Sequence, residues 1–175
     1  MEIDHRGPDP PFMNKMVDVP FHPEATGDFP VGIQVSKKHG ILYLVTKYGF
    51  VHLYDLESGT HIYMNQIFGE TIFVTAPHEA SHGIITINRK GQVLSVNIDE
   101  NTFLNYILVV LGNTELAFKL ARRANLPGTD DLYIRRYQRC IESRLYNEAA
   151  RIAADSPRAS YFAPLSQIFL MRLPL

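Results

Sequence analysis

Short runs rich in β-branched and aromatic residues fill the first half of the chain, and breaks with turn-forming residues separate them. These runs predict antiparallel β-strands, because the breaks leave no room for crossover helices. Seven strands are expected, at residues 31–36, 41–47, 50–56, 61–67, 71–76, 83–89 and 92–98. The segment 17–21 predicts a further short edge strand, because an edge tolerates the proline that it contains.

From Asp99 onward the apolar positions follow a helical spacing. The first helix is expected to start at the capping residues around Asp99 and to end at Gly112 and Asn113. Further helices are expected at 113–125, 131–144 and 146–155, with Thr129 or Asp130 as the N-cap of the third. Four short helices joined by tight turns predict antiparallel pairs, as in an α-solenoid.

The chain contains a repeat within its β part. The stretch HGILYLVTKYGFVHLYD begins at residue 39, and HGIITINRKGQVLSVNID begins at residue 82. A period of about 40–45 residues with short antiparallel strands is typical of a β-propeller blade. The expected fold is therefore β then α: two partial propeller blades of antiparallel sheet, the second showing three strands, followed by an α-solenoid or helical zigzag.

Composition and charge narrow the class of protein. Hydrophobic residues make up 46% of the 175 residues, which is normal for a globular chain. The net charge of −1 provides no overall attraction to nucleic acid. Cys140 is the sole cysteine, so no intrachain disulfide can form, which fits a reducing compartment. The sequence has no apolar signal-peptide core and no run of about 18 apolar residues, so an intracellular, soluble protein is expected.

Charge and proline content divide the chain into four expected segments. Residues 1–114 carry 7 Lys+Arg against 12 Asp+Glu, whereas residues 115–175 carry 10 against 6. The segments are an extended proline-rich start (1–30), two partial blades (31–98), α-helical linker repeats (99–157) and a divergent apolar tail (158–175). The open blade edges and this tail also predict possible self-association.

Long stretches of the sequence resemble the clathrin heavy chain. The stretches DFPVGIQVSKKHGILYLVTKYGFVHLYDLESGTHIYMN, GETIFVTAPHEA and NRKGQVLSV are similar to the end of its N-terminal propeller. The stretch YILVVLGNTELAFKLARRANLPGTDDLYIRRYQRCIESRLYNEAARIAADSP is similar to the helical linker that follows it. The likeness covers about residues 11–157.

The resemblance implies a non-enzymatic scaffold role. It implies vesicle coats and coated pits, endocytosis and intracellular vesicle-mediated transport, a cytoplasmic location on those coats, and adaptor or accessory proteins bound through extended peptides. Neither nucleic acid binding nor membrane insertion is expected, and no adaptor-binding residue is assigned. The early blades, the light-chain-binding region and the trimerisation region have no counterpart in this sequence. A truncated product without autonomous function is a further alternative.

A zinc hydrolase is the competing hypothesis. HEASH reads as H-E-x-x-H, in which His78 and His82 would bind zinc and Glu79 would act as general base. That chemistry requires both histidines on one helical face. Pro77 and Gly83 bracket the motif and strand-like runs flank it, so a turn between strands is predicted instead. No catalytic, metal or cofactor residue is therefore assigned.

Three other groups of residues have ordinary structural explanations. Cys140 falls on the apolar face of a predicted helix, where a buried thiol is common. The arginines of ARRAN and IRRYQR predict a solvated helical face and not a nucleic-acid site. Three strand tyrosines could line a peptide groove, although packing within the sheet is the more common role of strand aromatics. They are Tyr48, Tyr54 and Tyr63.

Overall fold

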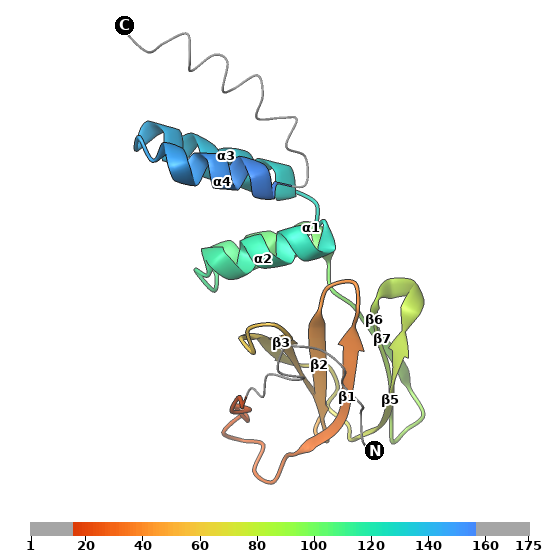
Figure 1. Ribbon diagram of the computed structural model, residues 1–175. Helices are drawn as coiled ribbons and strands as arrows, with labels where there is room; N and C mark the ends of the chain where they lie inside the picture. The colour runs from red at the N-terminus through yellow and green to blue at the C-terminus, as the bar shows by residue number, and fades with distance from the viewer. Residues whose placement is uncertain (1–15, 157–175) are drawn as a thin grey trace, which may run out of the picture.

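The structure, a computed structural model, describes residues 16–156. Two antiparallel sheets come first along the chain and four helices follow, as the sequence predicts (Figure 1). The first sheet has the strand order β1-β2-β3-β4, and the second has the order β5-β6-β7. The strands are β1 (Pro30–Ser36), β2 (Ile41–Thr46), β3 (Phe50–Asp55), β4 (His61–Gln66), β5 (Ile72–His78), β6 (Gly83–Asn88) and β7 (Val93–Val96).

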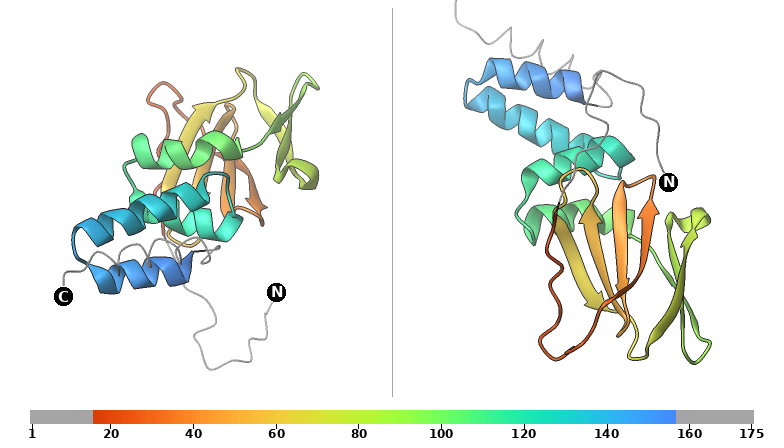
Figure 2. Two further views of the ribbon diagram at one scale, coloured as in Figure 1. Left: turned by 90° about the horizontal axis from the view of Figure 1, so that it is seen from above. Right: turned by 60° about the horizontal axis from the view of Figure 1, so that its bottom comes forward.

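The helices stack on the sheets in two layers. Helices α1 (Glu100–Val109) and α2 (Thr114–Ala124) lie between the sheets and the pair formed by α3 (Thr129–Glu142) and α4 (Tyr146–Asp155) (Figures 1 and 2). Each helix buries the apolar stripe that its sequence spacing predicts. In α2 this stripe contains Leu116, Leu120 and Ala124.

Two apolar cores follow from this stacking. The larger core combines the inner face of the first sheet with Ile72 and Ile84 of the second sheet and with the buried sides of α1 and α2. The smaller core packs Phe118 of α2 against α3 and α4. Helix α2 contributes to both cores, so it connects the sheets to the outer helix pair.

The predicted edge strand at 17–21 is wrong. These residues form no strand, and their side chains lie against the outer face of the first sheet, where Val17 and Val19 share a hollow with Leu42 and Leu44. The Phe21 ring lies 6.5 Å from the ring of His52 in an edge-to-face arrangement. As a result, β3 is buried at all six positions, between the N-terminal segment and the helices.

The starts of α1 and α2 agree with the sequence, whereas the N-cap of α3 does not. Asp99 caps α1 by accepting a hydrogen bond from the Asn101 amide at 3.1 Å. Asn113, predicted to follow the first helix and to open the second, caps α2. Gly128 is the N-cap of α3, because Thr129 is already helical and donates its hydroxyl to the Leu126 carbonyl at 2.5 Å.

Candidate functional site

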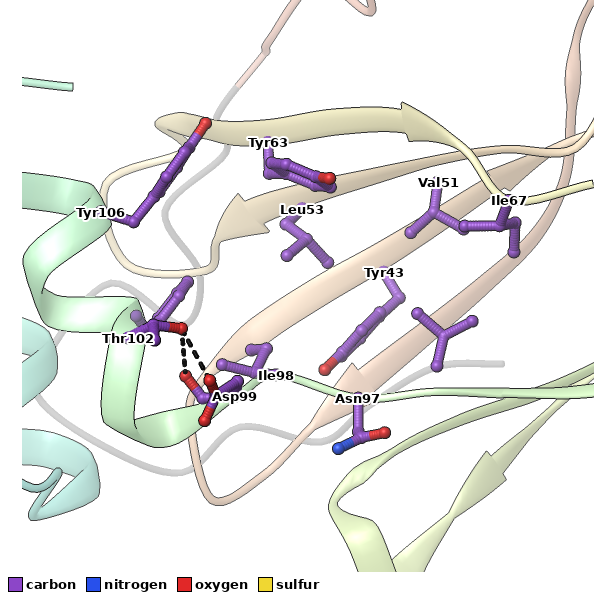
Figure 3. A pocket seen from close by; sticks show the side chains of 12 residues that line it. Tyr43, Val51, Leu53, Tyr63, Ile67, Asn97, Ile98, Asp99, Thr102 and Tyr106 are labelled. Carbon is purple, nitrogen blue, oxygen red and sulfur yellow. Dashed lines mark hydrogen bonds between the residues drawn. The ribbon is translucent and has the colours of Figure 1, made fainter. Parts of the chain in front are cut away.

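A groove of about 300 Å³ lies between the inner face of the first sheet and α1 (Figure 3). Its walls are mainly apolar and aromatic, which is the usual character of a ligand-binding cleft. One wall comes from β2, β3 and β4, and the other comes from α1 and the segment before it. The lining residues are Tyr43, Val51, Leu53, Tyr63, Ile67, Val96, Asn97, Ile98, Asp99, Thr102, Phe103 and Tyr106.

The strand register places the sheet side chains of this groove on one face. Tyr43 pairs with Leu53 across β2 and β3, and Leu53 pairs with Tyr63 across β3 and β4. Directly paired residues of adjacent strands share a face, so the three side chains form a row. Tyr63 also meets Tyr106 of α1 edge to face, with ring centroids 5.8 Å apart, and both rings line the groove.

The Tyr43 hydroxyl is the one polar group deep in the row. The side chain is 1% exposed, and its oxygen has no hydrogen-bond partner among the residues that the structure describes. In Figure 3 this hydroxyl points toward Ile98. Burial raises the pKa of Tyr43 to about 12, so the group is a neutral donor at physiological pH.

Arg123 of α2 forms hydrogen bonds with the first sheet. Its Nε donates to the His39 carbonyl at 2.9 Å, and its Nη2 donates to the Gly40 carbonyl at 3.1 Å and to Asp55 Oδ1 at 2.5 Å. The Asp55 side chain is fully buried. Burial alone would raise the pKa of Asp55, but hydrogen bonds from Ser58 and Arg123 outweigh it and hold the pKa below its usual value.

Glu100 makes a second connection at the start of α1. Its Oε1 lies 2.5 Å from Lys38 Nζ and 2.9 Å from His39 Nε2. Burial lowers the pKa of His39, although the hydrogen bond with Glu100 opposes the shift. The other ring nitrogen of His39 lies 2.9 Å from Ser36 Oγ. The turn between β1 and β2 is thereby bound to both α1 and α2.

The opposite face of the first sheet carries a cluster of rings that sequence reasoning missed. His52, Tyr54 and His61 lie together, with centroids 4.9 to 6.3 Å apart. Neither ring nitrogen of His52 has a partner within residues 16–156. Burial lowers the pKa of both histidines, and the charge of His61 adds to the effect at His52.

The HEASH motif forms a turn, as predicted. Glu79–Ser81 is a single 3-10 turn that joins β5 to β6, and His82 follows with a left-handed backbone at φ 54°. His78 Nδ1 lies 2.6 Å from Ser81 Oγ, whereas the His82 ring lies 6.2 Å from the ring of His39. Residues 16–156 hold no group of three or more His, Cys, Asp or Glu side chains placed to bind a metal.

The other residues singled out from the sequence are dispersed. Tyr63 lines the groove, Tyr48 lies beside a separate hollow near the N-terminal segment, and Tyr54 faces that segment. Cys140 is buried against α4 as expected. The tail 158–175 lies outside the described residues. Across residues 16–156, no helix is both long and apolar enough to cross a bilayer.

Comparison with known proteins agrees with this architecture. The family model described as the clathrin propeller repeat matches residues 65–99, which span the second sheet. The model described as Clathrin-H-link matches residues 125–160, which include α3 and α4. The chain is a relative of the clathrin heavy chain.

Curated relatives extend the likeness over most of the chain. The clathrin heavy chain of Drosophila melanogaster is 54% identical over 154 residues, which is 88% of this chain. Clathrin heavy chain 2 of Homo sapiens is 52% identical over 148 residues, and a probable clathrin heavy chain of Schizosaccharomyces pombe is 48% identical over 158 residues. These matches cover 85% and 90% of this chain. The chain spans only 9% of the Drosophila and human proteins and 10% of the yeast protein.

Proposed function

We propose that this chain is a structural, non-enzymatic segment of a clathrin-type vesicle coat, in which it holds propeller blades and a helical arm in a fixed relation. The likeness to clathrin heavy chains supports the assignment. In this proposal the protein lies on coated vesicles and coated pits and takes part in vesicle-mediated transport.

The connection between α2 and the first sheet carries this proposal. Arg123 makes three hydrogen bonds to the sheet and its turn, and one continuous apolar core joins both sheets to α1 and α2. Motion of α2 relative to the first sheet would break the Arg123–Asp55 ion pair and expose that core. A scaffold needs such a joint, because a flexible joint would not fix the direction of the arm.

Adaptor-type proteins are the proposed partners, and the groove is their proposed site. In this proposal the apolar side chains of an extended peptide pack against the lining of the groove, where Tyr63 is 37% exposed. Peptide grooves commonly combine apolar contacts with a few fixed hydrogen bonds.

Fractionation of cells tests the coat assignment. We expect an epitope-tagged full chain to sediment with coated vesicles and to leave them when the coat is stripped. The variant Arg123→Glu should still be expressed but should be depleted from this fraction. A folded wild-type chain that stays wholly in the supernatant would contradict the coat role.

Affinity capture tests the groove separately. Immobilised wild-type chain should retain adaptor proteins from a cell extract, and Tyr63→Ser should retain fewer of them. Tyr48→Ser is the matched control, because it removes a tyrosine that lines a different hollow. Equal retention by both variants would reject the groove while leaving the coat role intact.

A further inference from the structure

A second groove lies in the helical part, between the α1–α2 layer and the α3–α4 pair. Its volume is about 470 Å³, and residues from all four helices and the turn between α3 and α4 line it. The apolar part includes Leu108, Phe118, Leu132 and Leu145. Leu145 is 49% exposed, so the groove has an accessible apolar surface.

Three arginines of α3 line the same groove: Arg135, Arg136 and Arg139. Their spacing of three and four residues places them along one side of the helix. Glu148 is the one acidic residue among the lining residues that the structure describes. Its Oε2 accepts a hydrogen bond from the Cys140 thiol at 3.9 Å. The groove is therefore basic as well as apolar.

The arginines differ in how they are held. Arg136 lies over the Phe118 ring at 4.5 Å from its centroid, and Phe118 in turn packs edge to face on Tyr133. Arg135 and Arg139 are exposed and form no ion pair with any of residues 16–156. Their guanidinium groups are thus available for a ligand, and guanidinium binds carboxylates in a two-point geometry.

From this geometry we infer that the helical groove is a docking site for an acidic peptide segment of a partner protein, with apolar side chains between the acidic ones. The apolar side chains pack on Leu108, Phe118 and Leu132. The carboxylates pair with Arg135 and Arg139. This site is separate from the groove beside Tyr43 and does not depend on the proposed coat function.

Charge complementarity selects a partner and not the chain's own tail. Residues 157–175 contain two arginines and no Asp or Glu, so they would add positive charge to a basic groove. A nucleic acid would satisfy the arginines but would leave the apolar side chains uncovered. A peptide with acidic and apolar residues matches both features of the groove.

Fluorescence anisotropy with three labelled 12-residue peptides tests the inference on the full chain. The first alternates Asp or Glu with Leu or Phe, the second replaces the acids by their amides, and the third replaces the apolar residues by Ser. We expect the first peptide to bind best and its affinity to fall as NaCl rises. A labelled single-stranded RNA of 20 nucleotides serves as the competing polyanion.

Two charge-matched variants locate the site. Arg135→Gln with Arg139→Gln should weaken binding of the first peptide at least about tenfold, which corresponds to about 1.4 kcal/mol. Lys37→Gln with Arg89→Gln removes the same charge from exposed positions in the β part, outside the groove, and should change binding less than about twofold, as expected for distant surface charges. Circular dichroism checks that both variants are folded. Equal effects of the two variants, equal binding of all three peptides, or binding of the RNA alone would overturn the inference.

Discussion

Replacement of Arg123 by alanine is the sharpest test of the joint between α2 and the first sheet. The change removes the cation beside Asp55, whose side chain is fully buried, and all four hydrogen bonds of the guanidinium, the longest of them to exposed Glu57 at 3.5 Å. Loss of one partner from a buried ion pair costs about 3–5 kcal/mol. The Arg123 side chain is 25% exposed and Ser58 still donates two hydrogen bonds to Asp55, so we expect a smaller loss of about 2–3 kcal/mol.

Urea unfolding followed by circular dichroism measures this loss. Arg122→Ala is the matched control, because this neighbouring arginine is 64% exposed and its partner Asp155 is 59% exposed, at 3.4 Å. An exposed pair contributes about 0.2–1 kcal/mol, so the control should remain close to wild type. The double variant Arg123→Ala with Asp55→Asn should be less destabilised than the sum of the two single variants, because the two residues interact directly.

The pH dependence provides an independent check. Asp55 has a pKa below its ordinary value of 3.8, so its stabilising contribution is present above pH 3.8 and is lost as the pH falls through the lowered value. The difference between wild type and Arg123→Ala should therefore shrink in acid. The reasoning fails if Arg123→Ala costs no more than Arg122→Ala, or if the difference between wild type and Arg123→Ala is unchanged by acid.

Three further predictions concern other parts of the molecule. Gly83→Ala should destabilise the protein by about 1–3 kcal/mol in the same urea assay, because its Cβ would lie 2.1 Å from the Val96 carbonyl oxygen, whereas Gly69→Ala meets nothing within 4 Å and should be nearly neutral. The melting temperature should fall as the pH drops below 6.5, because the pKa values of His52 and His61 are lowered in the folded protein and the unfolded chain therefore binds protons first. The variant His52→Phe with His61→Phe should flatten this dependence of melting temperature on pH. An unchanged dependence would exclude these histidines as its cause. Metal analysis of the purified protein should find no stoichiometric zinc, and zinc that disappears on His82→Ala would revive the hydrolase hypothesis.

The sequence predicts the elements well because each has a clear local pattern. All seven strands and four helices occur where the runs and the helical spacing place them, within a few residues. The prediction of an edge strand at 17–21 was wrong because a short apolar pattern does not distinguish pairing at a sheet edge from packing across a sheet face. Only the tertiary structure decides between these two, and here the segment covers β3.

The candidate sites were harder to predict because they depend on contacts between distant residues. Arg122 and Arg123 are identical neighbours in the sequence, yet Arg123 contacts Asp55, 68 residues away, and Arg122 contacts Asp155 near the end of α4. The helical spacing does carry a partial signal. Arg123 follows the buried Leu120 by three residues, so it lies beside the apolar stripe of α2.

The positions of the tyrosines also depend on tertiary contacts that the sequence pattern does not encode. Tyr63 lines the groove beside α1, whereas Tyr48 and Tyr54 lie elsewhere, and Tyr43, which also lines it, was not singled out from the sequence. Alternation along a strand separates Tyr43 from Tyr54, since their strand partners Leu53 and Leu42 point to opposite faces. Which face becomes the groove depends on where α1 packs, and no local pattern encodes that.

Helix α2 connects the two cores and lines the helical groove. Leu116 and Leu120 pack into the core under the sheets, while Phe118 packs on α3 and supports Arg136 in the helical groove. Arg123, near the end of the same helix, fixes its position against Asp55. A change that loosens α2 from the sheet must therefore also shift the helical groove. The Arg123→Ala variant should for this reason weaken binding of the acidic peptide as well as stability, although it does not line that groove. Arg122→Ala should leave both unchanged, and this difference would separate coupling through α2 from a general loss of positive charge.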